Sequence, residues 1–290
     1  MERVLSGLSY PVGLVAAPDG GLLVGEGGSG CVLEIDAGGA RRVIARLPGA
    51  PMGVARTSSG HLVVADNGGK FPPAPSTNDE SGADAGLPAL YRIDLDGSVA
   101  LLAAAMDEVA LVAPNGVCVD DAGGAWFTEA LWDFGADALD RGSLGYVAAD
   151  GTLSLVRTDL RFPAALAFDA AGDTLFVSES LDGGIWAFDV VGPGRLGEPV
   201  LFASLGADVI PSGIALDVEG RMLVTGHLSG RVHVLSSAGH ELDGLGIGRA
   251  SGLAHIAFGG PDLTTMFIAA AATGEIYATE WDSPGLPLRG

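Results

Sequence analysis

The stretch APNGVCVDDAGGAWFTE at residues 113–129 contains the pattern that decides the fold. A proline opens an apolar run, DDAGG follows as a turn, and a second apolar run ends on an acid. Short apolar runs that contain β-branched and aromatic residues and are bounded by glycine turns are typical of β-strands. The stretch therefore predicts two strands joined by a tight turn.

The same outline recurs along the chain. The matching segments are YPVGLVAAPDGGLLVGE, APMGVARTSSGHLVVAD, FPAALAFDAAGDTLFVSE and IPSGIALDVEGRMLVTGH, with a degenerate LAHIAFGGPDLTTMFIAA near the end. These units begin near residues 11, 51, 114, 163, 211 and 252, and turns such as DLDGS and AADGT indicate two further strands in each. Units of four strands at this period are typical of propeller blades. We expect residues 1–290 to form a single all-β domain, a six-bladed β-propeller with four-stranded antiparallel blades.

The two ends of the chain support the same blade count. The sixth unit supplies only three strands before the tail SPGLPLRG, whereas the early segment ERVLSGLSYP resembles RRVIARLPGAP, the outer strand before the second unit. An N-terminal strand added to the last blade would leave no open edge in the ring. We expect the ring to close in this way.

The repeat also predicts which residues face the central channel. In a propeller the first strand of each blade lines the channel, and the residue after each opening proline lies near one mouth. Two insertions, at 68–88 and at 130–142 with Trp132 and Phe134, fall at the same mouth. Long loops gathered at one place usually cover a site, although tolerated surface insertions are the alternative.

Composition limits the partners. The 290 residues are 48% hydrophobic and have a formal net charge of −21. Such a chain repels phosphate backbones and anionic lipid, so we expect no nucleic-acid or membrane partner. Cys31 and Cys118 lie in apolar runs and are expected to be buried thiols. No apolar run is long enough for a membrane span or signal peptide, so we expect a cytoplasmic monomer or weak homo-oligomer.

The repeated openings resemble those of a known family. The proline-x-glycine openings, PNGVCVDDAGGAWFTE, and AFGGPDLTTMFIA followed by the SPGLPL tail are similar to the senescence marker protein/gluconolactonase family, also called regucalcin-like. The resemblance covers nearly the whole chain. It implies a six-bladed propeller with one site at the channel mouth. In the hydrolases of this group it implies a divalent cation held by Glu, Asn and Asp side chains.

This sequence departs from the family pattern at those ligand positions. The resemblance places the first-blade Glu on Val12, the fourth-blade Asn on Ala164 and the fifth-blade Asp on Ser212. Asn115 is the one retained ligand. Calcium takes about six to eight oxygen ligands, with carboxylates prominent among them. We therefore expect no cofactor, although calcium or another divalent cation held by rebuilt ligands such as Glu26 or Glu129 stays an alternative.

Two histidines are candidate acid–base groups. His227 ends the second strand of the fifth unit, and His255 is expected at the channel position of the sixth. Imidazole exchanges protons near neutral pH, so either could catalyse proton transfer, and a structural role is the alternative. The remaining histidines are His61 and His240, in turns, and His233, in an outer strand.

Acids end the second strands of the first four units, at Glu26, Asp66, Glu129 and Glu179. An acid at the same place in four repeats is best explained by a repeated structural task, such as accepting backbone N–H groups from the neighbouring loop. Glu129 and Asp66 are the catalytic candidates among them because the insertions begin beside them, and Asn67 adjoins Asp66 as a substrate-binding amide.

The other polar motifs indicate little chemistry. Ser212 has no Gly-x-Ser-x-Gly elbow, and GEGGSG at 25–30 joins two strands without a helix to receive phosphate. The predicted substrate-binding side chains are mainly apolar, which favours an apolar small molecule as substrate. They are Val12, Met52, Asn67, Trp132, Phe134, Ala164 and Ser212.

Three functions agree with these features. We favour a metal-independent enzyme that cyclises, isomerises or cleaves an apolar small molecule, as in natural-product biosynthesis, with His255, Asn115 or an acid transferring protons. Strictosidine synthase, a more distant propeller enzyme by resemblance, implies that such folds can catalyse ring formation without a metal. The alternatives are a lactonase or ester hydrolase with a weak or rebuilt cation site, and a non-catalytic ligand-binding propeller.

Overall fold

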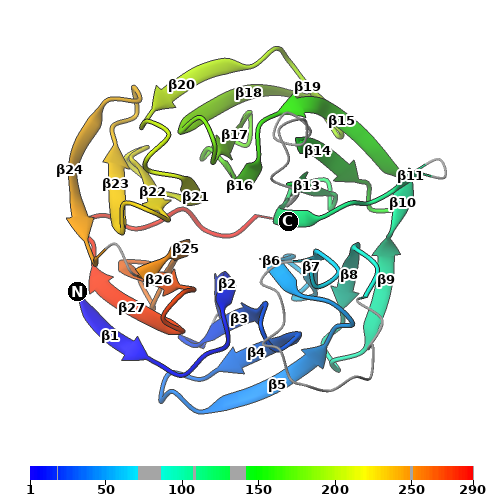
Figure 1. Cartoon of the computed structure of the whole chain (residues 1–290), viewed down its shortest axis with the longest axis horizontal. Helices are drawn as coiled ribbons and strands as arrows, with labels where there is room; N and C mark the ends of the chain where they lie inside the picture. The colour runs from blue at the N-terminus through cyan, green and yellow to red at the C-terminus, as the bar shows by residue number, and fades with distance from the viewer. Residues whose placement is uncertain (18, 71–85, 107–108, 131–141, 249–250, 290) are drawn as a thin grey trace.

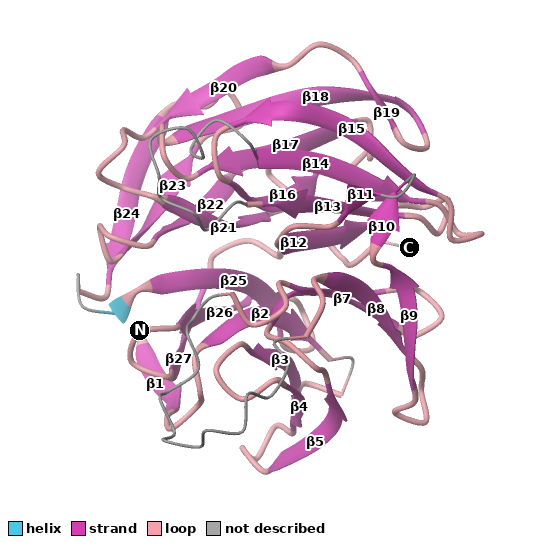
Figure 2. Ribbon diagram, turned by 45° about the vertical axis from the view of Figure 1, so that its right-hand side comes forward, coloured by secondary structure: helices cyan, strands magenta, loops and turns pink. Residues whose placement is uncertain are grey.

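Six antiparallel sheets surround a central channel like the blades of a propeller (Figure 1). The computed structural model describes residues 1–289 except 18, 71–85, 107–108, 131–141 and 249–250. Strands are the regular elements of every blade (Figure 2). The innermost strand of five blades begins at the opening proline of its sequence repeat, and that of the sixth begins at Leu253. The predicted six-bladed, all-β propeller is confirmed.

Each blade contains four main strands, ordered from the channel outward. Blades one to three contain β2 (Pro11–Ala16), β3 (Leu22–Glu26), β4 (Cys31–Ile35) and β5 (Arg41–Arg46); β6 (Pro51–Arg56), β7 (Leu62–Asp66), β8 (Ala89–Ile93) and β9 (Val99–Ala103); and β12 (Pro114–Val119), β13 (Ala125–Glu129), β14 (Gly142–Val147) and β15 (Leu153–Leu160). Blades four to six contain β16 (Pro163–Phe168), β17 (Thr174–Glu179), β18 (Gly184–Gly192) and β20 (Val200–Ser204); β21 (Pro211–Leu216), β22 (Met222–Gly226), β23 (Arg231–Leu235) and β24 (Glu241–Gly246); and β25 (Leu253–Gly259), β26 (Thr265–Ala270), β27 (Glu275–Glu280) and β1 (Glu2–Leu5). Three two-residue strands complete the set: β10 (Ala105–Met106), its partner β11 (Val109–Ala110), and β19 (Arg195–Leu196), which pairs with β18.

The N-terminal strand closes the ring as predicted. β1 pairs antiparallel with β27, with Glu2 opposite Ala278 and Arg3 opposite Tyr277. An ion pair of 2.8 Å between Arg3 Nη1 and Glu275 Oε1 adds to the backbone ladder at the surface. The last blade therefore joins the two ends of the described chain.

The hydrophobic core is divided among the blade interfaces. Each of six clusters of buried side chains spans two neighbouring blades, including the pair formed by blades six and one. The cluster between blades three and four contains Trp126 and Tyr146, with ring centroids 4.7 Å apart, together with Phe168 and Phe188. Burial of each such large side chain contributes about 2 kcal/mol, so every blade is stabilised by both neighbours.

Close packing around the channel explains the glycine of each proline-x-glycine opening. A Cβ atom on Gly116 would lie 2.1 Å from the carbonyl oxygen of Ala164 in the next blade, and one on Gly13 would lie 2.5 Å from that of Met52. Only a residue without a side chain permits these approaches between innermost strands. The repeated glycines are therefore needed for contacts between blades as well as for turns within them.

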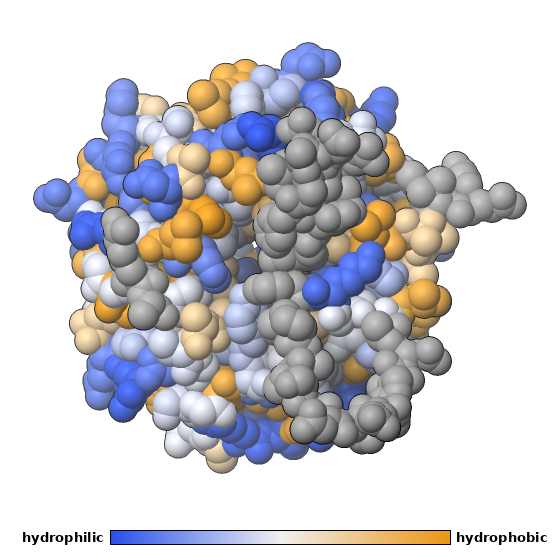
Figure 3. All heavy atoms as spheres, in the orientation of Figure 1, coloured by the Kyte–Doolittle hydropathy of each residue, from blue (hydrophilic) through white to orange (hydrophobic). Residues whose placement is uncertain are grey.

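Thiols and surface agree with the composition. Cys31 and Cys118 are free, Cys31 is buried, and burial raises the pKa of the Cys118 thiol. On the face drawn in Figure 3, hydrophilic residues lie around the outer edge of the ring with hydrophobic residues among them. Among the described residues, no helix has the length and apolar character needed to cross a membrane.

Candidate active site

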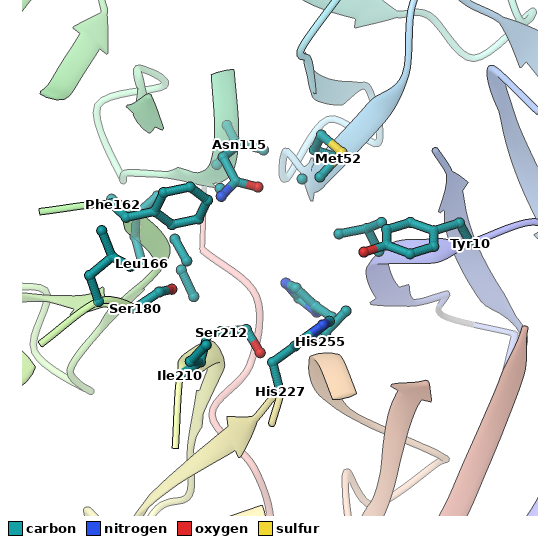
Figure 4. A pocket seen from close by; sticks show the side chains of 18 residues that line it. Tyr10, Met52, Asn115, Phe162, Leu166, Ser180, Ile210, Ser212, His227 and His255 are labelled. Atoms are coloured by element: carbon teal, nitrogen blue, oxygen red, sulfur yellow. The ribbon is translucent and has the colours of Figure 1, made fainter. Parts of the chain in front are cut away.

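A cavity of about 240 Å³ opens at one end of the central channel (Figure 4). The second residue of each innermost strand contributes to its wall, and the described lining contains no charged side chain. Seven of the predicted site residues line it, and they are Val12, Met52, Asn115, Ala164, Ser212, His227 and His255. These predicted positions therefore meet at one cavity, and their roles in binding or catalysis stay predictions.

The structure corrects the register assigned to His255. In blade one, Pro11 pairs with Glu26 and Gly13 with Gly25; in blade six, Leu253 pairs with Ala270 and His255 with Ala269. His255 thus occupies the glycine position, and Ala254 occupies the channel position that the sequence repeat had assigned to His255. Blade six lacks the opening proline that fixes the alignment elsewhere, which explains the shift of one residue.

His255 lies between two cavities of the channel. It lines the mouth cavity and also a second cavity of about 580 Å³ towards the far end, as Val117 and Leu166 do. Burial lowers the pKa of its imidazole to about 4, so the ring is neutral at pH 7. Its Nδ1 is buried without a hydrogen-bond partner among the described residues. A bound ligand could supply that partner.

His227 is held in one orientation by the neighbouring blade. Its Nδ1 lies 3.2 Å from the carbonyl oxygen of Leu253, an acceptor, so Nδ1 carries the proton in the neutral ring. Nε2 then keeps its lone pair and has no hydrogen bond to another described residue. Burial lowers the pKa of His227, although the hydrogen bond with Leu253 opposes this effect. The result is a neutral imidazole able to act as a base.

Asn115 faces the two imidazoles across the cavity. Figure 4 shows its amide on the side opposite to His227 and His255. Only 9% of Asn115 is exposed, and its side chain makes no hydrogen bond to another described residue. Its amide can therefore bind a ligand. Ser212 differs, because its hydroxyl already lies 2.8 Å from the Leu253 carbonyl oxygen and is held within the fold.

Three bulky residues of the cavity wall were missed from the sequence. Tyr10, Phe162 and Ile210 directly precede the opening prolines of their blades and have φ angles of 54°, 55° and 51°. Positive φ is uncommon outside glycine and costs about 1–3 kcal/mol, and such strain gathers at functional sites. The available signal was their size, since the second and third repeats have alanine before the proline.

Tyr10 adds a polar group to this wall. Its hydroxyl points towards the cavity in Figure 4. Burial raises the pKa of the phenol to about 12, so the hydroxyl keeps its proton at neutral pH. Tyr10 therefore places a protonated hydroxyl on the side of blade one.

The acids at the ends of the second strands do not line the cavity. Glu129, a catalytic candidate from the sequence, accepts the Val112 N–H at 2.6 Å and the Ser143 hydroxyl at 2.9 Å. Asp66, the other, accepts the Ala50 N–H at 2.8 Å, and burial raises the pKa of its carboxyl. Both perform the structural task that their repetition predicted, which places them away from a ligand in the cavity.

Glu26 and Glu179 occupy the same position in their blades. Glu26 accepts the Ser9 N–H at 2.8 Å, and Glu179 accepts the Arg161 N–H at 2.7 Å. Asn67 is fully buried and accepts the Gly69 N–H at 3.0 Å, so its predicted contact with substrate is not formed by the described cavity. Trp132 and Phe134 lie outside the described residues.

The described donors do not fit a divalent cation. Val12, Ala164 and Met52 offer no oxygen from their side chains, and Asn115 offers one neutral amide oxygen. Among the residues that the structure describes, no three His, Cys, Asp or Glu side chains gather as a metal site. Calcium needs several oxygen ligands, usually including carboxylates. Glu26 and Glu129, the possible rebuilt ligands, are engaged in backbone contacts away from the cavity.

The C-terminal segment covers the far end of the channel. It crosses the centre of the ring in Figure 1 and is held by backbone hydrogen bonds, including one from Leu286 N to the Leu216 carbonyl oxygen at 2.9 Å. The Arg289 guanidinium contacts Asp121 and the backbone carbonyl oxygens of Asp169 and Ala170. Leu286 and Arg289 line the far cavity. The C-terminal segment therefore forms part of the wall of the far cavity.

Comparison with known families agrees with this architecture. The profile described as "SMP-30/Gluconolactonase/LRE-like region" matches residues 32–272. No curated protein sequence matches the chain.

Solved structures with the same fold have diverse activities. A gluconolactonase from Xanthomonas campestris is 22% identical, with a TM-score of 0.76 over 98% of this chain and 88% of that one. A calcium-binding regucalcin from Agrobacterium tumefaciens is 17% identical, with a TM-score of 0.79 over 100% and 96%. Virginiamycin B lyase from Staphylococcus aureus, a catalytically inactive histidine-to-alanine variant with quinupristin, is 14% identical, with a TM-score of 0.66 over 99% and 87%.

Proposed function

The chain belongs to the SMP-30/gluconolactonase/LRE-like family, and from this premise we propose that it is an enzyme that transfers protons on an apolar small molecule without a metal ion. The observation behind the proposal is the cavity itself. Two neutral imidazoles face an amide across a cavity whose wall is mainly apolar. The described residues of that wall include no carboxylate. Cyclisation, isomerisation and lyase reactions of substrates with an acidic C–H can begin with such a proton transfer.

His227 is the proposed base. Its Nε2 has a lone pair because Nδ1 is committed to the Leu253 carbonyl oxygen. A pKa lowered by burial keeps the imidazole unprotonated at neutral pH, and it favours return of the proton to the product. His227 therefore suits a reaction that removes a proton from one atom of the substrate and delivers it to another.

Asn115 and Tyr10 are the proposed donors on the opposite walls. Removal of a proton beside a carbonyl places negative charge on the carbonyl oxygen, and donors directed at that oxygen stabilise the charge. The Asn115 amide and the protonated Tyr10 hydroxyl can supply such hydrogen bonds. His255 is the proposed second group for proton relay, through the buried Nδ1 that has no hydrogen-bond partner in the part of the chain that the structure describes.

The structural neighbours support a role for histidine. Virginiamycin B lyase, which shares this fold, is catalytically inactive in a histidine-to-alanine variant. The second candidate function is lactone hydrolysis, which the gluconolactonase neighbour favours. The apolar wall of this cavity suits an apolar lactone better than a polyhydroxylated one.

Deuterium exchange tests the proposal directly. The protein is incubated in D₂O with apolar lactones, cyclic esters and ketones that have an acidic C–H, and each product is examined by mass spectrometry. We expect deuterium in the product. In His227→Gln the rate of deuterium incorporation should fall by about 100-fold or more. His240→Gln, at an exposed turn, is the matched control and should retain the rate. Unchanged turnover in both His227→Gln and Asn115→Ala would exclude these roles.

A further inference from the structure

A second group of polar side chains lies in blade five, outside the cavity wall. Ser229 is in the loop after β22, His233 is on β23 and Glu241 begins β24. Ser229 Oγ lies 3.0 Å from His233 Nε2, and His233 Nδ1 lies 2.6 Å from Glu241 Oε1. Serine, imidazole and carboxylate thus form one continuous hydrogen-bonded chain.

The direction of these hydrogen bonds follows from the carboxylate. An ionised Glu241 only accepts, so it receives the proton on His233 Nδ1. In the tautomer with its proton on Nδ1, the imidazole has a lone pair on Nε2, and the Ser229 hydroxyl, which also lies 3.4 Å from the Gly226 carbonyl oxygen, can donate to it at 3.0 Å. This is the arrangement that activates a serine for nucleophilic attack, in which the acid orients the imidazole and the imidazole accepts the serine proton.

Gly226 creates the space for this arrangement. A Cβ atom at Gly226 would lie 2.1 Å from Ser229 Oγ and 3.1 Å from His233 Nε2. In blade one the corresponding position is Glu26, whose carboxylate accepts the hydroxyl of the corresponding serine, Ser29, at 2.7 Å. In blade one the serine therefore donates to a structural acid, whereas in blade five the corresponding serine contacts an oriented imidazole.

The surroundings leave the serine accessible. Ser229 is half-buried, and Leu228 beside it is 50% exposed. The His233 side chain is 9% exposed, whereas that of Glu241 is 53% exposed. The backbone N–H of Ser229 donates to no described residue and can stabilise the oxyanion that forms on the ester carbonyl oxygen when the hydroxyl attacks. An uncharged ester with a small apolar acyl group suits this position on a chain of net charge −21.

We propose that Ser229, His233 and Glu241 form a nucleophilic site that accepts the acyl group of small uncharged esters, separate from the channel cavity. The Ser229 Oγ forms a bond to the acyl carbon while its proton moves to His233 Nε2. The ester C–O bond then breaks, and the proton leaves with the alcohol. Water attacks the acyl-serine in the same way, gives its proton to Nε2 and releases the carboxylic acid as the serine recovers its hydrogen.

An alkyl fluorophosphonate probe tests this site in the full chain. Attack by Ser229 forms an O–P bond and expels fluoride, and intact-mass and peptide spectrometry locate the adduct. We expect one adduct per chain, on Ser229, and none on Ser229→Ala. His233→Gln should react at least about 100-fold more slowly. Ser29→Ala, which removes the corresponding serine of blade one, should react like the wild type.

Two further variants separate reactivity from folding. Glu241→Gln changes a largely exposed side chain, so the chain should keep its melting temperature while labelling slows. Gly226→Ala should displace the hydroxyl and abolish labelling. The proposal fails if the wild type gives no adduct, if the adduct maps elsewhere, or if folded Glu241→Gln and His233→Gln react at the wild-type rate. None of these outcomes depends on His227 or Asn115.

Discussion

The Nδ1 of His227 and the carbonyl oxygen of Leu253 lie 3.2 Å apart and connect the loop after β22 with the first strand of the next blade. The Ser212 hydroxyl reaches the same oxygen at 2.8 Å. A single backbone carbonyl therefore orients the proposed base and holds a serine of the neighbouring channel wall. The chemistry of the cavity thus depends on how blades five and six are placed against each other.

The pH dependence of turnover should follow the imidazole of His227. Burial lowers its pKa below the ordinary value of 6.5, so the ring is in its basic form from neutral pH down to below 6.5. We expect kcat/KM to stay level across that interval and to fall in more acidic solution as the ring gains a proton. Stopped assays from about pH 8 to about pH 4 measure the profile. An acidic limb above 6.5 would contradict this assignment.

The free energy of unfolding should depend on His255 in acid. The unfolded imidazole binds a proton below 6.5 and the folded one only below about 4, so the unfolded state binds more protons in between. The contribution to stability is complete above 6.5 and is lost as pH falls through 4, about 3 kcal/mol in all. Urea unfolding of the wild type and of His255→Leu measures the difference in slope. The comparison is needed because burial raises the carboxyl pKa of Asp66 and Glu179, which opposes the trend.

Gly116→Ala should disturb the packing between blades three and four and lower the free energy of unfolding. The new Cβ would lie 2.1 Å from the Ala164 carbonyl oxygen, which belongs to backbone and cannot rotate away. We expect a loss of about 2–3 kcal/mol in the free energy of unfolding, measured by urea titration. The reverse change at the corresponding position of blade four, Ala165→Gly, should cost less than about 1 kcal/mol. Equal effects would show that the close approach is relieved by local adjustment.

Glu129→Gln should affect stability rather than turnover. The carboxylate accepts the Val112 N–H and the Ser143 hydroxyl and does not line the cavity. Replacement by an amide should cost about 1–3 kcal/mol and leave turnover per folded molecule unchanged. Glu198→Gln, whose side chain is 95% exposed, is the control for loss of one charge. Loss of turnover with an unchanged free energy of unfolding would contradict this prediction and indicate a catalytic role for Glu129.

The six-bladed ring could be predicted from the sequence because the repeated residues are those that begin the innermost strands and pack between blades. Each opening proline marks the start of an innermost strand, and in four of these five blades a glycine two residues later marks the approach of the next blade. The same repeat predicted that Glu26, Asp66, Glu129 and Glu179 would share one structural task, which their backbone hydrogen bonds confirm. Positions within the repeat were therefore predictable.

Departures from the repeat were harder to predict. His255 was placed one residue wrongly because Leu253 replaces the proline that would have fixed the register. Tyr10, Phe162 and Ile210 were missed because a residue before proline normally avoids the left-handed region that these three adopt. The chain from Ser229 to Glu241 crosses a loop and two strands, and no short motif describes it. Each case needed distances between residues, which a linear pattern does not contain.

The pairing of β1 with β27 has a consequence for synthesis of the protein. β1 precedes the other described strands in the sequence and β27 follows them, so β1 has no partner strand until the sixth blade is made. A chain interrupted before residue 275 lacks that partner, and its first strand keeps an exposed edge open to aggregation or proteolysis. Closure of the ring therefore waits for the last strand of the sixth blade.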